Sequence, residues 1–295
     1  MNIFRMHIKP DGKASRKRTF EYCLENNLLG VGWKVQDVDN TKNWEDYYEK
    51  AKEKYGKVNQ CDYIRKHVKV DDLMWTRDKS KGYFLAKVVS EWEYFNSEAS
   101  INENIDIVNI FRVELLAVPI GAVPGKVIAS FRASRACQKI DGKSIKIYSR
   151  ILWNELSKIQ YYDTSNDKFD DIFLMLDDEE TEDLVFLYLQ SIGWYVVPSS
   201  RKGDTMSFEY LAINPKTGRR ALTQVKTGQS NVPRSSYSNR DSDEHIFLFQ
   251  TNEKYTEESS GLVTNISRKN IIDFLRESRD WLPENFTLKM KACAM

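Results

Sequence analysis

The C-terminal part of the chain alternates between helical and strand-like patterns of apolar positions. Residues 181–192 place apolar side chains at helical spacing, and Gly193 directly after them is a common stop signal for a helix. A second helical pattern covers residues 267–278. The strands predicted between these helices cover residues 194–197, 207–213, 221–226 and 245–250. A helix, three strands, a loop, a strand and a final helix together predict an α/β sandwich.

The N-terminal part is patterned differently, with short strand-like runs separated by proline and glycine. The predicted strands cover residues 28–35, 83–89, 113–118 and 127–131, and the predicted helices cover residues 19–26 and 44–55. This succession predicts a small β-barrel-like or α+β domain. The fold class expected for the whole chain is therefore mixed, α+β or α/β, with a β-rich domain first.

A polar, turn-rich stretch over residues 161–178 separates the two patterns. Two domains suit a chain of 295 residues, because single domains are commonly ~100–200 residues long. We expect an N-terminal domain over residues 1–160, an acidic linker over 161–180 and a C-terminal domain over 181–295. Residues 161–200 carry a net charge of −9, whereas the segments before and after them carry +7 and +3. Basic segments suit a polyanionic partner, although ordinary solvated surface explains so small an excess equally well.

The remaining composition narrows function mainly by exclusion. No run approaches the ~18 apolar residues that a membrane helix needs, and the first residues are too polar for a signal peptide. We therefore expect a cytoplasmic protein with no membrane partner. The four cysteines and three histidines are scattered, which argues against a disulfide framework or a zinc site. A metalloenzyme of this composition would hold its metal with carboxylates, which favours a hard cation such as Mg²⁺.

The sharpest chemical pattern lies on two predicted strands joined by the turn-rich residues 214–218. Such a turn predicts a hairpin, and alternate residues of a strand share one face, so Gln224 and Lys226 should point the same way. Glu209 lies on the neighbouring strand and can meet that face. Phosphodiester cleavage uses these groups, because acidic and amide oxygens hold Mg²⁺ while a lysine positions water or stabilises charge. An ordinary surface hairpin with solvated charges is the alternative interpretation.

The order of an acid, a turn and then Gln-x-Lys resembles the PD-(D/E)xK nuclease superfamily, and within it the Mrr-like branch. That family places an acid on one strand and (D/E/Q)-x-K on the next, here Glu209 followed by Gln224-Val225-Lys226. A helix ending in a pattern like L-x-x-x-G-(Y/W) precedes them, here at residues 189–194. The resemblance covers roughly residues 180–250. It implies a restriction-endonuclease-like fold and catalysis with Mg²⁺ or Mn²⁺.

The same resemblance implies a further acid near the start of the preceding helix. Glu182 fits this position, with Asp183 as the alternative. The implied metal ligands are then Glu209, Gln224 and Glu182. The sequence departs from the family by having Glu209 where Asp is commoner and Gln224 where an acid is commoner. One carboxylate fewer could weaken metal binding, and Asp204 in the preceding loop could compensate.

Two tryptophans of the N-terminal part lie in strand-like positions flanked by turns, Trp33 after Gly30-Val31-Gly32 and Trp75 after Leu73-Met74. Proteins that read one base hold it between aromatic faces, each stacked base contributing ~1–3 kcal/mol. The Gly-x-Gly-Trp strand, the Asp72-x-x-Trp75-x-Arg77 element and residues 123–127 resemble the PUA-like superfold, nearest its EVE and YTH-like branches. The resemblance covers roughly residues 1–160. It implies a β-barrel with an aromatic pocket for a modified base.

Four further residues are candidates for contacts to a base or a phosphate. Tyr83 could add an aromatic wall, and Asp37 could contact a base edge. Arg132 and Arg135 could grip phosphate groups. Each candidate has an ordinary alternative, because tryptophans in small β-domains more often belong to the core, acids often serve turns, and arginines often lie in solvated loops.

The two halves together resemble a modification-dependent restriction endonuclease, in which a reader domain recognises a modified base in foreign DNA and an attached nuclease cuts nearby. Such an enzyme would act on double-stranded DNA, as a homodimer because double-strand cleavage usually needs two active sites. Three alternatives stay open: an RNA- or structure-directed nuclease, a binding protein with a degenerate metal site that acts as a sensor, and an unrelated α+β protein with coincidental motifs. The last would place Glu209 and Lys226 on opposite faces of the sheet.

Overall fold

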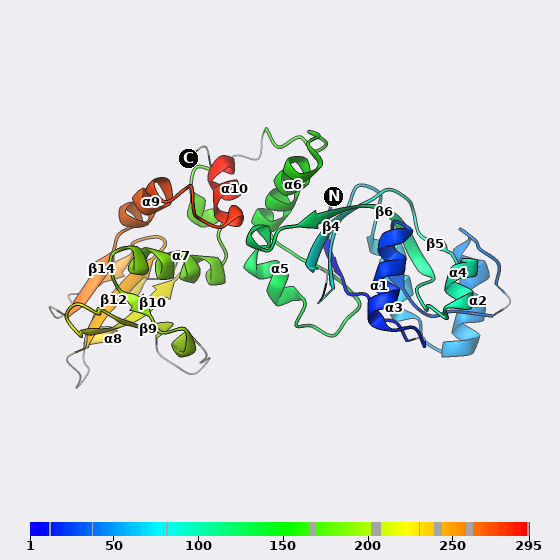
Figure 1. Ribbon diagram of the computed structural model, residues 1–295, viewed down its shortest axis with the longest axis horizontal. Coiled ribbons are helices and arrows are strands. Elements are labelled where there is room, and N and C mark those ends of the chain that lie inside the picture. Colours follow the sequence, from blue (N-terminus) through cyan, green and yellow to red (C-terminus); the bar gives the residue numbers. More distant parts are fainter. Residues whose placement is uncertain are drawn as a thin grey trace. The chain divides into compact units, whose positions relative to one another are not determined.

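The computed structural model divides the chain into two compact units (Figure 1). It describes residues 1–11, 13–36, 38–78, 80, 82–165, 169–201, 208–229, 231–238, 244–257, 262–293 and 295. Unit 1 comprises Met1–Lys168 and Glu284–Ala292, and unit 2 comprises Phe169–Pro283 and Cys293–Met295. Each unit combines a sheet with helices, so the chain is a mixed α and β protein.

Unit 1 is built on a seven-stranded sheet that curls into a half-barrel (Figure 1). Its strands are β1 (Ile3–Met6), β2 (Leu28–Val31), β3 (Leu73–Asp78), β4 (Gly82–Val88), β5 (Glu93–Tyr94), β6 (Asn109–Val118) and β7 (Cys137–Lys139). The order is β2-β6-β4-β3-β1-β7, and β5 also pairs with β6. The strand β1 is parallel to β3, and the other pairs are antiparallel. Among the described strands no pairing joins β2 to β7, so the sheet is open where the sequence predicted a barrel.

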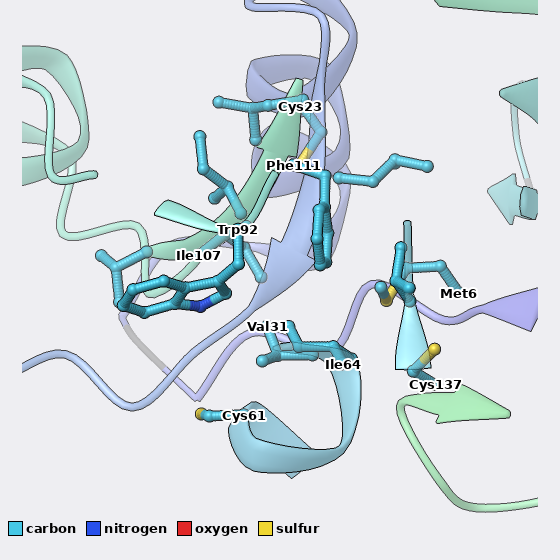
Figure 2. Packing of buried hydrophobic residues seen from close by; sticks show 14 of the residues in the cluster. Met6, Cys23, Val31, Cys61, Ile64, Trp92, Ile107, Phe111 and Cys137 are labelled. Atoms are coloured by element: carbon cyan, nitrogen blue, oxygen red, sulfur yellow. The ribbon is translucent and has the colours of Figure 1, made fainter. Parts of the chain in front are cut away.

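Helices cover this sheet and share its apolar core. They are α1 (Arg16–Glu25), α2 (Trp44–Tyr55), α3 (Asn59–His67), α4 (Glu98–Asn102), α5 (Gly125–Ser130), α6 (Lys143–Ser157), α10 (Glu284–Ala292) and the 3₁₀ turn η1 (Ile120–Ala122). Cys23 of α1 and Cys61 and Ile64 of α3 belong to the same buried cluster as the strand residues Val31 and Phe111, and Figure 2 shows Ile64 next to Val31. Burial of these side chains from both helices and the sheet removes apolar surface from water and stabilises the unit.

The predicted strand at residues 127–131 was wrong, because most of this run belongs to helix α5. Pro124 precedes the helix with extended backbone and serves as its N-cap. Val127 and Phe131 are both buried, and a spacing of four residues is the spacing of one helix face. A short apolar run fits a strand and a buried helix equally well, so periodicity alone does not distinguish them.

Unit 2 is built on a mixed five-stranded sheet. Its strands are β8 (Tyr195–Val196), β9 (Tyr210–Ile213), β10 (Arg220–Lys226), β12 (His245–Gln250) and β14 (Val263–Ile266), in the order β14-β12-β10-β9-β8. The strands β10, β12 and β14 are parallel, whereas β9 is antiparallel to both of its neighbours. A separate small parallel sheet pairs β11 (Val232–Pro233) with β13 (Tyr255–Thr256). The predicted strands at 194–197, 207–213, 221–226 and 245–250 correspond to β8, β9, β10 and β12, and the sequence missed β14.

The helices of unit 2 flank its sheet. They are α7 (Asp178–Ser191), α8 (Ser235–Ser238), α9 (Arg268–Glu277) and the 3₁₀ turns η2 (Ile172–Leu174) and η3 (Pro198–Arg201). The helix α7 packs against β8, β10 and α9, and Figure 1 shows α7 and α9 on the same side of the sheet. The predicted helices at 181–192 and 267–278 therefore correspond to α7 and α9.

The boundary between the units differs from the predicted one. Residues 161–165 belong to unit 1, where the Tyr162 hydroxyl donates to the Asp71 carbonyl at 3.0 Å. Phe173 belongs to unit 2 and packs against Phe249 with ring centroids 5.5 Å apart. The terminal helix α10, expected in the C-terminal domain, groups with unit 1 and packs against α6 and η1. The described part of the predicted linker is therefore packed into one unit or the other.

The acidic run that the sequence assigned to the linker forms the start of α7. Asp177 is the N-cap, and Asp177 and Glu180 form a reciprocal capping box with distances of 2.9 and 3.0 Å. Asp178 and Glu179 lie in the first turn. Negative charge at a helix N-terminus interacts favourably with the helix dipole, so these acids serve the helix rather than a solvated tether.

Candidate active site

The turn between β9 and β10 is held by its own residues. The Asn214 side chain accepts from the backbone N–H of Lys216 at 3.0 Å. Gly218 has φ of 69°, in the left-handed region that glycine adopts without a steric penalty. A turn made by local sequence in this way determines which residues of the two strands face each other.

The β9–β10 pairing places Glu209 across from Gln224. Tyr210 pairs with Thr223, and the Glu209 N–H donates to the Thr223 carbonyl at 2.9 Å. Gln224 Nε2 lies 2.5 Å from Glu209 Oε1, and Lys226 Nζ lies 3.9 Å from the same oxygen. The acid, the amide and the ammonium group therefore meet on one face of the sheet, which is not the arrangement expected of coincidental motifs.

The three side chains differ in how far they reach solvent. Gln224 is buried, whereas the side chains of Lys226 and Glu209 are 48% and 27% exposed. The Gln224 Nε2 atom also donates to the Val225 carbonyl at 3.2 Å, so this nitrogen lies between two oxygens. Rotation of the amide would present Gln224 Oε1 beside the same two oxygens. The buried end of the cluster is therefore rich in oxygen, and the exposed end carries a positive charge.

Glu182 comes to this cluster from α7. Burial, and to a smaller extent the negative charge of Glu209, raise the pKa of the Glu182 carboxyl to about 7. The Tyr210 hydroxyl donates to the Glu182 carbonyl at 3.4 Å, which joins the helix to β9. Asp183, the alternative acid, makes the closer ion pair with Arg201, at 2.7 Å. Glu182 is thus the acid of α7 whose charge interacts with Glu209.

Arg201 is a residue of this region that the sequence did not single out. It ends η3, lies 3.8 Å from the Glu182 carboxylate and stacks over the Phe186 ring at 5.6 Å. Its positive charge acts on Glu182 in the direction opposite to that of Glu209. An arginine in a polar loop carries no sequence signal of its own, so only the fold reveals this contact.

The donor set fits a hard cation in its chemistry. Glu209 and Glu182 supply carboxylates that repel each other, and a cation would relieve that repulsion. Gln224 and the Val225 carbonyl add neutral oxygens. Among the described residues no group of three or more His, Cys, Asp or Glu side chains gathers as a metal site, so these two carboxylates need the neutral oxygens or water to complete coordination. Asp204, the acid predicted to compensate, lies outside the described residues.

Unit 1 contains a cavity of about 280 Å³, called here the Trp33 cavity. Its lining includes the side chains or backbone of His7, Lys9, Trp33, Gln60, Ser134 and Arg135. Trp33 and Arg135 are thus two predicted base-binding residues that the structure brings to one cavity. Trp33 has φ of 67°, which is uncommon for a bulky residue and is found where surrounding contacts hold the backbone.

Trp75, predicted as a wall of a base pocket, is instead a core residue. Its side chain is completely buried, and the indole N–H donates to the Ser149 hydroxyl of α6 at 3.0 Å. A buried tryptophan needs such a partner for its N–H. With no exposed ring face, Trp75 offers no surface for stacking a base.

Tyr83 and Arg132, two other predicted contacts, are not among the described residues that line the Trp33 cavity. The Tyr83 hydroxyl accepts from Arg77 at 2.9 Å, and its ring meets the Phe131 ring edge-on at 5.9 Å. Arg132 is exposed. Asp37 lies outside the described residues. Only part of the predicted base-contacting set is therefore found together.

The buried His7 ring makes the stability of unit 1 depend on pH. Burial, together with the positive charges of four neighbours, lowers the pKa of His7 from 6.5 to about 4. Between these pH values the unfolded chain binds more protons than the folded one, so the free energy of unfolding should fall as the pH is lowered from 6.5 to 4. Urea denaturation at several pH values measures this. His7→Gln should show a smaller fall, whereas the exposed-site control His67→Gln should behave like the wild type; equal curves for all three would contradict the assignment.

Comparisons with known proteins give no relative from which a function could be inferred. No family model matches the chain, and searches of curated proteins and of solved structures return no match. In the described part of the chain, no helix has both the length and the apolar character required to cross a membrane.

Proposed function

We propose that unit 2 is a metal-dependent nuclease that hydrolyses phosphodiester bonds. The observation that carries the proposal is the convergence of the Glu209 carboxylate, the Gln224 amide and the Lys226 ammonium group on one face of the β9–β10 hairpin. Glu182 adds a second carboxylate whose charge interacts with that of Glu209. The PD-(D/E)xK resemblance of the same residues supports this assignment.

Each side chain has a defined part in this chemistry. Glu209, Gln224 and Glu182 would hold Mg²⁺ or Mn²⁺, which when bound polarises the phosphate and acidifies water. Lys226 places its ammonium group at the exposed end of the cluster, where a phosphate oxygen or an attacking water can reach it. Its ammonium group donates hydrogen bonds to the negative charge that builds up as the phosphodiester is attacked.

We further propose that unit 1 directs this nuclease to double-stranded DNA carrying a modified base, as in restriction of foreign DNA. The Trp33 cavity supports this part, because a tryptophan and two cationic residues, Lys9 and Arg135, are among its lining residues. Flipped bases are commonly held by stacking and by a few hydrogen bonds. Double-strand cleavage by one centre per chain is consistent with a homodimer as the active form.

Cleavage of matched substrates tests both parts. The purified protein is incubated with Mg²⁺ or Mn²⁺ and two DNAs of one sequence, one unmodified and one with methylated or hydroxymethylated cytosine, beside an RNA of that sequence. We expect cutting of the modified DNA alone. Equal cutting of both DNAs would support the nuclease but contradict the reading of a modified base. Cutting of RNA alone would establish the RNA-directed alternative.

A binding protein with a degenerate metal site is the second candidate. Two observations favour it: Gln224 stands where a carboxylate is common, and the described residues gather no third acidic ligand. Under this alternative, the modified DNA binds in the same assay and no substrate is cut with either metal. Binding with cleavage excludes it.

A further inference from the structure

His7, one of the residues that line the Trp33 cavity, has several cations near it. Besides burial, the groups that lower the pKa of His7 are Arg16, Lys9, Arg5 and Arg77. Arg16 contacts His7 Nε2 directly. These cations come from separate parts of unit 1: Arg5 and His7 lie on or next to β1, Arg16 begins α1 and Arg77 is on β3. The fold therefore concentrates positive charge around one buried ring.

This charge has no acidic counterpart within the part of the chain that the structure describes. None of Arg5, Lys9, Arg16 and Arg77 makes an ion pair with a described carboxylate, and no acidic residue is among the described residues lining the cavity. Their hydrogen-bond partners among the described residues are neutral: Lys9 Nζ donates to the Ser134 carbonyl, and Arg5 donates to the Gln138 amide oxygen at 3.0 Å. A cluster of cations in a half-enclosed site without carboxylates attracts an anion.

Two buried polar atoms at this place also lack partners. Arg5 is completely buried and His7 is 8% exposed, and neither Arg5 Nε nor His7 Nδ1 has a hydrogen-bond partner among the residues that the structure describes. Buried polar groups are nearly always hydrogen-bonded, and a buried charge without a compensating charge is unfavourable. An anion held beside these groups would offset that cost.

Trp33 is one of the lining residues of the cavity, and neighbours hold its backbone in place. The Trp33 carbonyl accepts from the Tyr47 hydroxyl at 3.1 Å, and the Asp106 carboxylate accepts from the next backbone N–H, that of Lys34, at 3.0 Å. The volume of about 280 Å³ lies near the lower end of ligand pockets, ~300 Å³. This size suits one planar ring with a single substituent rather than several linked nucleotides.

We propose that the Trp33 cavity binds a single nucleotide unit that carries a negative charge, with the ring against Trp33 and the charge compensated by Lys9 and Arg135 of the lining and by Arg16 beside His7. The charge is either the phosphate of the nucleotide or an acidic substituent on its base. This inference rests on the proposed reading of nucleic acid by unit 1 and deepens it, because it defines an anion as the feature that the cavity requires. A neutral modified base alone lacks that feature.

Calorimetric titration of the full-length protein in EDTA separates the contribution of the ring from that of the negative charge, and it does not depend on cleavage. The probes are deoxycytidine, deoxycytidine 5′-monophosphate, 5-carboxyldeoxycytidine and inorganic phosphate. We expect the monophosphate, the carboxyl compound or both to bind roughly tenfold or more tightly than deoxycytidine and than inorganic phosphate. Preference for the monophosphate identifies the backbone phosphate as the source of charge, and preference for the carboxyl compound identifies the base.

Equal binding of deoxycytidine and both anionic compounds would overturn the requirement for charge, and equally tight binding of inorganic phosphate would overturn the requirement for a ring. Absence of binding by every probe would overturn the proposal as a whole. Because EDTA removes the metal, none of these results depends on the nuclease, and cleavage by unit 2 can succeed or fail independently.

Variants of residues at the cavity test whether the ligand binds there. Lys9→Gln and Arg16→Gln should each weaken the anionic probe roughly tenfold and leave deoxycytidine unchanged. Lys17→Gln, an exposed neighbour on α1, is the matched control and should bind like the wild type. Trp33→Asn suits the left-handed backbone and should weaken the anionic probe about tenfold through loss of stacking. Unchanged affinity in all three cavity variants would place the ligand elsewhere and overturn the assignment.

Discussion

Replacing Lys226 with alanine should lower the single-turnover rate constant of DNA cleavage by about 10²–10³-fold. Lys226 Nζ lies 3.9 Å from Glu209 Oε1 and its side chain is half exposed, so a phosphate can reach this cation at the cluster. Alanine removes the hydrogen-bond donor that would meet developing negative charge, while β10 keeps its backbone pairing. Lys216→Ala, an exposed lysine at the hairpin turn, is the matched control and should cut at the wild-type rate.

The companion change Glu209→Ala should remove cleavage as well, for a separate reason. Glu209 is the carboxylate that contacts Gln224, so its loss removes a proposed metal ligand. Mn²⁺ should raise the melting temperature of the wild type and of Lys226→Ala, and it should not raise that of Glu209→Ala, because a ligand stabilises only a fold that binds it. Cleavage by both variants at the wild-type rate would show that the active centre does not lie at the β9–β10 hairpin.

The parts of the candidate site that the sequence predicts are those that depend on local geometry. A turn built by Asn214 and Gly218 and the two-residue alternation of a strand are enough to bring Glu209, Gln224 and Lys226 to one face. Glu182 required a resemblance to a known family, because the packing of α7 on the sheet decides which acid of the helix approaches Glu209. Arg201 gave no signal, since its contacts with α7 are entirely tertiary.

Tertiary packing also explains where the predictions for unit 1 differ from the structure. The run at residues 127–131 has no periodicity that separates a short strand from a short helix, and Pro124 precedes a helix there. A tryptophan in an alternating run can face either side of a sheet, and α6 covers the side on which Trp75 lies. The cations around His7 come from β1, α1 and β3, so no segment of the sequence displays their convergence.

Trp75→Ala should lower the free energy of unfolding of unit 1 by about 3–5 kcal/mol, because it leaves a cavity in a closed core. Trp75 is completely buried and its indole N–H has the Ser149 hydroxyl as partner, so alanine removes both packing and a hydrogen bond. Trp75→Phe keeps most of the ring and should cost less. Denaturant unfolding followed by circular dichroism measures these changes.

The same variants distinguish a core residue from a base-contacting one. Ile159→Ala truncates an apolar side chain that is exposed in the same unit and should change stability by no more than about 0.5 kcal/mol. If Trp75 instead stacked against a base, Trp75→Ala would weaken binding of modified DNA while leaving the unfolding transition close to that of Ile159→Ala. A large loss of stability, with the DNA affinity of the remaining folded protein retained, assigns Trp75 to the core and leaves Trp33 as the aromatic wall available to a ligand.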